Sequence, residues 1–399
     1  IEGICDAGAD AYDIGLSSTP MVYFGTANYG FKASVQITAS HNPAEYNGMK
    51  VSRENALPVG LDSGLGQIKE WIESSRPTPA AAKRGTVHEM DIHADYINFM
   101  KKFKGDYSNL KLAFDLSNGM ANLFAKEIYG DAPEYIFDTI DGRFPNHEPN
   151  PLVAKNVEPL KELVRRSGAD IGIIYDGDAD RVMFVDDKAR FIAPDLIIAL
   201  MALYFCDERG ARNPRVLQEI RSSKAVGEFL EKYGADLHTW KVGRAFAAPK
   251  LREIDGLWGG ELAGHYYFKD FFYSDSGLLS SMIVLRIVSR LKEQGIKLSD
   301  QIDSMTRYFN SGEINFKLED KAGAMKAVCD HFTAQEKPLK VMDFDGYRLE
   351  YPDWWFNIRP SNTEPYLRFI CEARTEDMLR SKVDETVSLL ERDFGAVRS

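Results

Sequence analysis

Three features that mark specialised classes of protein are missing from this chain. No apolar stretch reaches the roughly 18 residues of a membrane span, and the best candidate, Leu196 to Phe205, is too short. The net charge is −11 and no run of Lys and Arg occurs, which argues against a nucleic-acid surface. The cysteines form no CxxC pair, which is typical of reduced thiols: Cys5, Cys206, Cys329 and Cys371. We therefore expect a cytoplasmic protein that binds neither nucleic acid nor a membrane.

Length and composition predict an ordered protein of several domains. At 399 residues the chain is too long for one hydrophobic core and should divide into about two to four domains. With 44% apolar and 27% charged residues, its composition is that of an ordinary globular protein. Residues Ile1 to Ala9 look like part of a helix already under way, without an initiating Met. The sequence is therefore expected to be a fragment or a truncated chain.

Strand-like and helical patterns alternate along most of the chain, which predicts an α/β protein with sheets covered on both faces. Polar or Pro-rich breaks divide it near 74–80, 188–194 and 305–314. An apolar helix is expected from Asp195 to Phe205, after the second break. The last part differs because two helical segments flank two strands, over 321–332, 346–351, 366–373 and 376–394. That order predicts an α+β unit.

Two stretches about a hundred residues apart share one layout. Each reads as a strand, a polar turn and a helix that ends at a glycine, over 112–130 and 216–234. The sequence identity between them is weak, but the shared length and order indicate duplicated α/β domains.

A polar turn follows the apolar run 33–37, with the sequence Thr38-Ala-Ser-His-Asn-Pro43. A serine at a strand end, beside a proton donor or acceptor such as His41, can act as a nucleophile or carry a covalent group. Lys50 follows within Asn47-Gly-Met-Lys50. The alternative is a plain polar turn, because an Asn-Pro pair fixes loop geometry in either case. The turn alone does not decide between the two.

An acidic loop lies between two buried-strand patterns, with the sequence Asp176-Gly-Asp-Ala-Asp-Arg181. Three carboxylates at alternating positions can turn their oxygens toward one hard cation, whereas the structural alternative is a solvated acidic turn. A calcium EF-hand does not fit, because Arg181 stands where Gly is needed and the flanks are strands. Three ligands leave room for water and a phosphoryl oxygen, so Mg²⁺ beside an arginine favours phosphoryl chemistry.

Two further loops carry groups suited to a sugar phosphate. In Gly259-Gly-Glu-Leu-Ala-Gly-His265, Glu261 can accept sugar hydroxyls and His265 can donate to a hydroxyl or phosphate. In Arg359-Pro-Ser-Asn-Thr-Glu-Pro365, a guanidinium, two hydroxyls and an amide form a dense set of donors for a phosphate. Each has a structural alternative, a glycine-rich turn and a capped surface turn respectively.

Taken together, the four loops resemble those of the α-D-phosphohexomutase family, most closely the bacterial phosphomannomutases. The phosphoserine, metal, sugar and phosphate loops match 38–43, 176–181, 260–265 and 359–365 in that order. The resemblance implies three similar α/β domains with mixed sheets plus a C-terminal α+β domain, arranged around a central cleft. The expected ranges are 1–86 for the phosphoserine loop, 87–190 for the metal, 191–305 for the sugar and 306–399 for the phosphate.

The resemblance also implies an activity. Ser40 would carry a phosphoryl group that interconverts hexose 6-phosphate and hexose 1-phosphate, with mannose the expected sugar. One Mg²⁺ per site and a hexose 1,6-bisphosphate activator are implied, in a monomer or homodimer. The implied site residues are catalytic Ser40, Lys50, His41 and Arg181; metal ligands Ser40, Asp176, Asp178 and Asp180; and substrate-binding Arg221, Lys224, Gly243, Arg244, Glu261, His265, Arg359, Ser361, Asn362, Thr363 and Arg368.

The chain departs from the family pattern in three places. The family's first segment is missing upstream of Ile1, so the first sheet is expected to be incomplete. Ala263 stands where Ser is frequent, and Arg244 stands where several members have a His used in proton transfer. An arginine cannot be a general base at neutral pH, so that role would fall to Lys50 or His265.

Several other activities remain open from the sequence. Phosphoglucomutase and phosphoglucosamine mutase are the close alternatives, and Asn362 with the lead-in 354–357 favours mannose over glucosamine. From other classes, a Mg²⁺-dependent sugar phosphatase and an inactive sugar-phosphate-binding relative also fit the loops.

Overall fold

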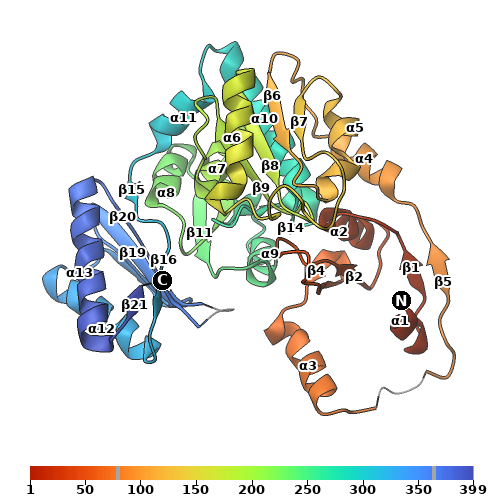
Figure 1. The fold of residues 1–399 in the computed structure, drawn as a ribbon, viewed down its shortest axis with the longest axis horizontal. Coiled ribbons are helices and arrows are strands. Elements are labelled where there is room, and N and C mark those ends of the chain that lie inside the picture. The colour runs from red at the N-terminus through yellow and green to blue at the C-terminus, as the bar shows by residue number, and fades with distance from the viewer. Residues whose placement is uncertain (78–80, 362–364, 399) are drawn as a thin grey trace.

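The computed structural model describes residues 1–77, 81–361 and 365–398, whose elements follow one another in four units (Figure 1). The first unit contains α1 (Glu2–Asp6), β1 (Ala11–Asp13), α2 (Thr19–Asn28), β2 (Ala33–Ile37), β3 (Met49–Arg53), β4 (Leu57–Pro58) and α3 (Leu65–Glu73). Helix α2 begins where the Ser18 side chain accepts a hydrogen bond from Met21 N and Pro20 supplies a helical φ.

The strands of the first unit are divided between two small sheets. Strands β2, β3 and β4 form an antiparallel sheet of three, and β1 pairs in parallel with β5 (Val87–Glu89). The sequence predicted a boundary between residues 86 and 87, and this second sheet crosses it. Helix α3 has no buried residue, and its hydrophobic side chains Ile68, Trp71 and Ile72 are exposed. The helix projects at the bottom of the molecule (Figure 1).

The second and third units share the order and directions of four strands, to which the third unit adds a fifth, β14. The second contains α4 (His93–Lys101), β6 (Leu112–Asp115), α5 (Ala125–Tyr129), β7 (Glu134–Ile136), α6 (Ala154–Ser167), β8 (Ile171–Tyr175) and β9 (Val182–Asp186), with the strand order β7-β6-β8-β9. The first three of these strands run parallel, and β9 returns antiparallel to β8.

The third unit repeats this order. It contains α7 (Pro194–Leu200), β10 (Arg215–Glu219), α8 (Lys224–Leu230), β11 (Asp236–Trp240), α9 (Arg244–Glu253), β12 (Trp258–Gly260), β13 (Tyr266–Phe268), β14 (Ser274–Asp275), α10 (Gly277–Glu293) and α11 (Leu298–Met305). Its sheet has the order β11-β10-β12-β13-β14, with β12 and β13 antiparallel. The shared topology supports the predicted duplication.

One predicted helix differs from the structure. The segment 195–205 was expected to be a single helix, but α7 ends at Leu200 and a π-helical stretch follows over Leu203–Glu208. An apolar run does not distinguish the wider turn of a π-helix from an α-helix, because both bury the same side chains.

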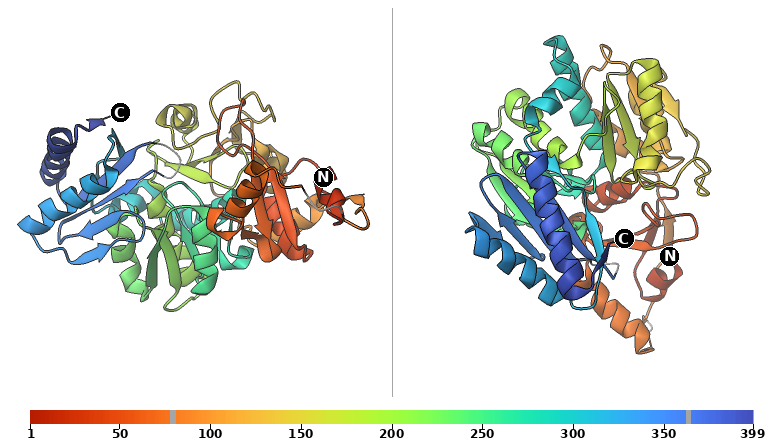
Figure 2. Two further views of the ribbon diagram at one scale, coloured as in Figure 1. Left: turned by 90° about the horizontal axis from the view of Figure 1, so that it is seen from below. Right: turned by 60° about the vertical axis from the view of Figure 1, so that its left-hand side comes forward.

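The C-terminal unit is an antiparallel sheet with its own core. It contains β15 (Phe309–Asn310), β16 (Ile314–Lys317), α12 (Lys321–Gln335), β17 (Lys340–Met342), β18 (Tyr347–Glu350), β19 (Trp354–Pro360), β20 (Leu367–Ala373), α13 (Glu376–Phe394) and β21 (Val397–Arg398). Helices α12 and α13 pack on the sheet and on each other (Figure 2). The predicted α+β order is confirmed, and α13 spans the predicted range between the caps Thr375 and Gly395.

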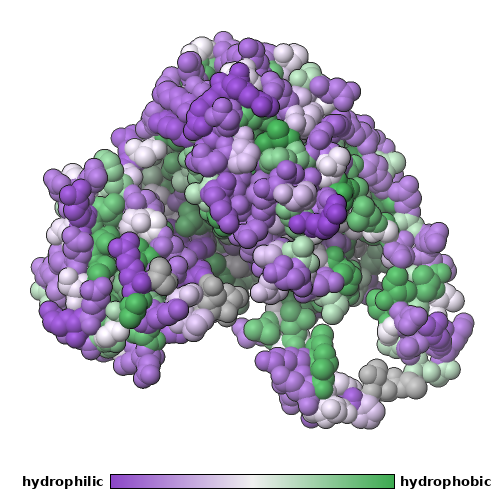
Figure 3. Space-filling view, in the orientation of Figure 1, coloured by the Kyte–Doolittle hydropathy of each residue, from purple (hydrophilic) through white to green (hydrophobic). Residues whose placement is uncertain are grey.

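The hydrophobic cores show how the units are joined. One continuous core includes Phe24 of the first unit, Phe114 of the second and Trp258 of the third, whereas the C-terminal unit packs around a separate core. The C-terminal unit lies to one side, and the space-filling view is notched between it and the first unit (Figures 1 and 3). Among the described helices, none is both long and apolar enough to span a membrane.

Candidate active site

The serine turn and the acidic loop pack directly against each other. Ser40 follows β2 and adopts a left-handed backbone with φ of 58°, which is uncommon for a residue other than glycine. A Cβ on Gly177 would stand 2.4 Å from the Ser40 carbonyl oxygen, so only glycine allows this approach. Asp176 directly follows β8, at the carboxyl end of a parallel strand, where ligand sites of α/β sheets form.

Lys50 connects the two loops. Its Nζ donates to Asp178 Oδ2 at 2.6 Å and to Asp180 Oδ2 at 2.5 Å, and it lies 3.3 Å from Ser40 Oγ. The residue is on β3, next to β2, so the hairpin of the first unit delivers both the hydroxyl and the ammonium. Burial opposes its charge, but the neighbouring carboxylates hold the pKa of Lys50 well above its usual value. Lys50 therefore remains a cation beside the serine.

The three aspartates form a buried carboxylate cluster. Ligand atoms of Asp176, Asp178 and Asp180 lie within 4.8 Å of one another. Burial and the two neighbouring charges raise the pKa of Asp176 well above its usual value. Burial acts in the same direction on Asp180, but the Lys50 charge outweighs it and lowers that pKa.

The cluster fits a divalent cation. One oxygen of each aspartate, Asp176 Oδ2, Asp178 Oδ1 and Asp180 Oδ1, is buried without a hydrogen-bond partner among the described residues. Buried carboxylate oxygens without a donor are costly, and a hard cation with oxygen ligands would satisfy all three. The donor set therefore suits Mg²⁺, as the sequence predicted.

His41 lies beside the serine but is a poor base. Its Nδ1 lies 3.3 Å from Ser40 Oγ. Burial, followed by the nearby charge of Arg181, lowers the pKa of His41 to about 4. The imidazole is therefore neutral at physiological pH and has little affinity for the serine proton.

A chain of charged and polar groups connects the acidic loop to the third unit. Arg181 Nε donates to His265 Nε2 at 2.9 Å, and His265 Nδ1 lies 2.6 Å from Asp275 Oδ2. Because Nε2 accepts from an arginine, the ring proton is on Nδ1 and donates to Asp275. Both ring nitrogens of His265 are thus engaged within the protein, which differs from the predicted role as a donor to substrate.

Arg244 lies at the other end of this chain. Its Nε donates to Asp275 Oδ1 at 2.9 Å, and its guanidinium lies 3.8 Å from the centre of the Tyr23 ring in the first unit. It also donates to the carbonyl of Ala56 at 3.3 Å. Gly243, the N-cap residue of α9, directly precedes it and has a φ of 115°. Arg244 therefore joins the first unit to the third.

The predicted phosphate-binding residues gather where the third and C-terminal units meet. Arg221 follows β10, while Arg359 and Arg368 face each other across β19 and β20. Glu313 bridges Arg221 and Arg368 at 2.9 Å each. Ser361 donates its backbone N–H to Tyr366 O, and Asn362 and Thr363 lie outside the described residues.

Two further predicted residues have hydrogen-bond partners within the protein. Lys224 was expected near the metal and phosphates, but its Nζ donates to the carbonyl of Tyr351 at 2.7 Å in the C-terminal unit. Glu261 is 2% exposed and accepts a hydrogen bond from Tyr267, and burial raises its pKa to about 7.

Sequence reasoning missed several residues of the site. The hydroxyls of Thr19 and Thr38 donate to Asp178 Oδ2 at 2.5 and 3.2 Å, and Asp275 holds both His265 and Arg244. Thr38 is inside the serine turn and could have been found there. Thr19 begins α2 and Asp275 ends the short strand β14, and only the tertiary fold brings them to the site.

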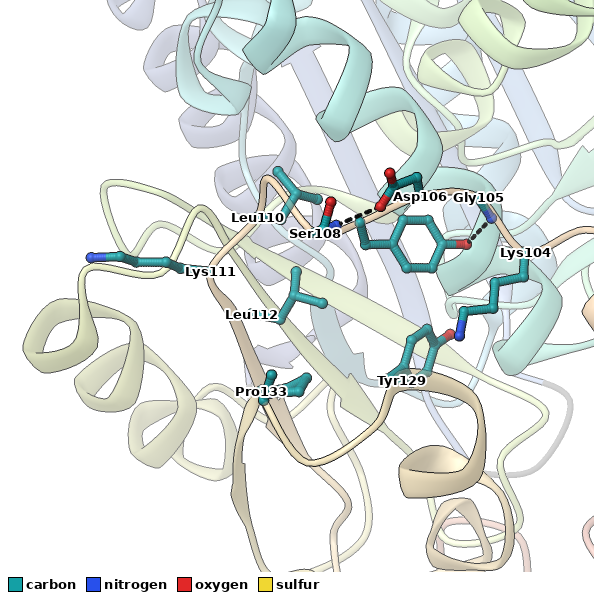
Figure 4. Close-up of a pocket in the computed structure, with 11 residues that line it drawn as sticks. Lys104, Gly105, Asp106, Ser108, Leu110, Lys111, Leu112, Tyr129 and Pro133 are labelled. Carbon is teal, nitrogen blue, oxygen red and sulfur yellow. Dashed lines mark hydrogen bonds between the residues drawn. The ribbon is translucent and has the colours of Figure 1, made fainter.

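A separate pocket of about 260 Å³ lies away from these groups. It is lined by residues around the amino end of β6, including Lys104, Tyr107, Leu112 and Tyr129 (Figure 4). The acidic loop is at the carboxyl end of the same sheet, so the pocket contains none of the candidate catalytic residues.

The fold and site together define an intramolecular phosphotransferase, with a serine seated on a carboxylate cluster between α/β units. Family models match four successive segments: Phosphoglucomutase/phosphomannomutase alpha/beta/alpha domains I, II and III over 1–77, 94–189 and 193–308, and the C-terminal domain over 313–389. The chain belongs to the phosphoglucomutase/phosphomannomutase family and is a phosphohexomutase, an isomerase. These segments fall near the predicted domain ranges, whose exact boundaries stay a prediction.

Named relatives agree over nearly the whole chain. A phosphomannomutase of Escherichia coli is 35% identical, covering 97% of this chain and 87% of that protein. A phosphomannomutase of Methanocaldococcus jannaschii is 33% identical, covering 96% and 84%. A crystal structure of a phosphoglucomutase/phosphomannomutase family protein from Burkholderia thailandensis shares 25% identity with a TM-score of 0.82, covering 98% of this chain and 84% of that chain.

Proposed function

We propose that this phosphohexomutase interconverts mannose 6-phosphate and mannose 1-phosphate through phosphorylated Ser40 and a hexose 1,6-bisphosphate. The observation that carries the proposal is Ser40 Oγ at 3.3 Å from Lys50 Nζ, above three buried carboxylates. Mannose is supported by the phosphomannomutases that are 33% and 35% identical to this chain. The glucose pair is the second candidate sugar.

In the proposed reaction a sugar hydroxyl attacks the phosphorus of phospho-Ser40. The bond from Oγ to phosphorus breaks as the sugar O–P bond forms. The Lys50 ammonium gives a proton to the departing Ser40 Oγ, and the proton that the sugar hydroxyl releases restores the ammonium. The Lys50 ammonium lies beside Ser40 Oγ and stabilises negative charge on the departing oxygen. The bisphosphate then turns in the site, and the other phosphoryl group returns to Ser40 by the same steps in reverse.

Asp176, Asp178 and Asp180, with the phosphoserine, are the proposed ligands of one Mg²⁺. When bound, Mg²⁺ supplies positive charge that stabilises the phosphoryl oxygens during transfer. Lys50 already neutralises part of this cluster, so the carboxylates keep a fixed arrangement before the cation binds.

The roles proposed for the remaining site residues follow from where their side chains lie. Arg181, held by His265, faces the transferring group from the acidic loop. Arg221, Arg359, Ser361 and Arg368 are proposed to hold the phosphate that does not react, together with Asn362 and Thr363. Glu261 is proposed to accept a hydrogen bond from a sugar hydroxyl. Proton transfer is assigned to Lys50 rather than to His265, whose ring nitrogens are both engaged.

Hexose monophosphates are the proposed small-molecule partners, and the protein is proposed to be a cytoplasmic monomer or homodimer. The four cysteines are all free, which supports a reducing compartment.

A coupled assay tests the proposed function. With Mg²⁺ and a hexose 1,6-bisphosphate primer, mannose 1-phosphate should be converted faster than glucose 1-phosphate, with almost no release of free phosphate. Ser40→Ala should abolish turnover and remove one phosphoryl group from the intact mass. Steady phosphate release without isomer interconversion would establish a phosphatase instead, and a Ser40→Ala variant as active as the parent would exclude the phosphoserine route.

A further inference from the structure

Glu313 occupies an unusual place between two arginines from different units. Its Oε2 lies 2.9 Å from Arg221 Nη1 in the third unit, and its Oε1 lies 2.9 Å from Arg368 Nη1 in the C-terminal sheet. One carboxylate thus joins two guanidinium groups with one oxygen each. A phosphate group offers the same arrangement of negative oxygens to arginines.

The surroundings of Glu313 are rich in positive charge. Arg359 lies opposite Arg368 in the sheet register, and its Nε is buried without a hydrogen-bond partner among the described residues. Arg221 is also paired with Glu219. Three arginines and two carboxylates therefore meet here, and Glu219 is almost fully buried whereas the Glu313 side chain is 24% exposed. Of the two carboxylates, Glu313 is the one that can leave.

We propose that Glu313 is an internal counter-ion that holds the Arg221–Arg368 pair until a substrate phosphate displaces it. This inference rests on the proposed function, in which these arginines bind the phosphate that does not react. In the free enzyme the carboxylate keeps two like charges together across the junction of the third and C-terminal units. A phosphate dianion makes the same contacts with more charge, so it replaces the carboxylate rather than adding to it.

The Glu313 counter-ion lowers the affinity of the enzyme for phosphate. Any phosphate that enters must break two charged hydrogen bonds that the enzyme already makes, so Glu313 lowers the affinity for every phosphate ligand. A side chain that only held the two units together would have the opposite effect, because its removal would disorder the arginines and weaken binding. The sign of the change in affinity separates the two roles.

Calorimetric titration of the full chain with inorganic phosphate and with mannose 6-phosphate tests the proposal. In Glu313→Gln, which keeps the shape and removes the charge, both ligands should bind about three- to tenfold more tightly, as expected for the loss of two competing, partly exposed ion pairs. Glu313→Asp keeps the charge and should stay within about twofold of the parent. Glu319→Gln, an exposed carboxylate beyond the end of β16, is the matched control and should change nothing.

Unchanged or weaker phosphate binding by Glu313→Gln, with its thermal unfolding still cooperative, would overturn the counter-ion role. Equal tightening in Glu319→Gln would overturn it as well, because the effect would then be one of net charge. The proposed function fails by a different result, the absence of sugar interconversion by the parent enzyme, so the two failures are distinguishable.

Discussion

The carbonyl oxygen of Ser40 occupies the space that a side chain on Gly177 would need, with 2.4 Å between that oxygen and the Cβ position. The serine turn and the acidic loop therefore depend on one glycine for their contact. Gly177→Ala should move one loop away from the other, and misplacement of reacting groups by about 1 Å lowers turnover on the order of a hundredfold. Steady-state kinetics would measure this. Gly142→Ala, where no atom lies within 4 Å, should retain the parent rate.

Lys50 compensates the buried carboxylates when no cation is bound. Lys50→Met should lower the free energy of unfolding by about 3 kcal/mol in EDTA, because it breaks the largely buried ion pairs with Asp178 and Asp180. Mg²⁺ should restore part of this loss, since the cation neutralises the same oxygens. Urea unfolding with and without Mg²⁺ measures both effects, and Lys32→Met, an exposed lysine, serves as the control. A loss that Mg²⁺ does not reduce would contradict the assignment.

Divalent cation should stabilise the folded protein through the aspartate cluster. At a Mg²⁺ concentration of about 100 times Kd, the expected gain is about 2.7 kcal/mol, observed as a rise in Tm of several degrees. Asp178→Asn should remove most of this rise, because it replaces one ligand oxygen by an amide. Asp62→Asn, on the exposed surface of the first unit, should keep it. An equal rise in both variants would place the cation elsewhere.

Arg244 should act through structure rather than through proton transfer. Arg244→Met leaves Asp275 with His265 as its remaining partner and removes the contact with the Tyr23 ring. We expect a loss of about 3 kcal/mol in stability and faster amide exchange around Ala56. Hydrogen exchange with mass spectrometry measures the second effect. The exposed Arg212→Met is the control, and unchanged exchange near Ala56 would rule out the anchoring role.

Asp195 should make the protein less stable as the pH rises toward neutrality. Its carboxyl is buried at the start of α7 and accepts a hydrogen bond from Ser223 N at 2.8 Å. Burial, followed by the charge of Glu372, raises the pKa of Asp195 from 3.8 to about 7. Between these values the folded protein binds more protons than the unfolded chain, so the free energy of unfolding falls with increasing pH.

In Asp195→Asn this contribution disappears, and the fall in stability between pH 5 and pH 8 should be smaller by on the order of 2 kcal/mol. Urea unfolding at the two pH values measures the difference. Asp384→Asn, an exposed carboxylate on α13, should follow the profile of the parent. Parallel profiles for Asp195→Asn and the parent would show that this carboxyl titrates normally.

The sequence was sufficient for the parts of the site that lie within short loops. Ser40 and the three aspartates stand in loops that follow β2 and β8, so local pattern and final position agree. Lys50 lies on β3, the strand paired with β2, and was predicted from the resemblance. The direction of a long side chain depends instead on its tertiary neighbours. Lys224 stands at the start of α8, and the family resemblance implied a place near the metal and phosphates. Its ammonium donates instead to two backbone carbonyls of the C-terminal unit.

Dependence on tertiary neighbours also explains the other residues and strand pairings that the sequence did not predict. Asp275 has no local motif, and it matters only because Arg244 and His265 converge on it from different elements. Asn362 and Thr363 were predicted from the phosphate loop and remain predictions. The division of the first unit into two sheets was also out of reach, since the pairing of β1 with β5 depends on residues more than seventy positions apart.

The hairpin β8–β9, which carries the three carboxylates, and the hairpin β12–β13, which carries Glu261, hold equivalent places in their two units. A bridge between Arg181 and His265 joins them face to face. The two turns carry different side chains, three carboxylates in one and a glutamate and a histidine in the other, while the strand pairing that supports them is alike. Exchanging short loop sequences, rather than whole domains, is therefore the economical route by which evolution or an engineer would change what this architecture accepts.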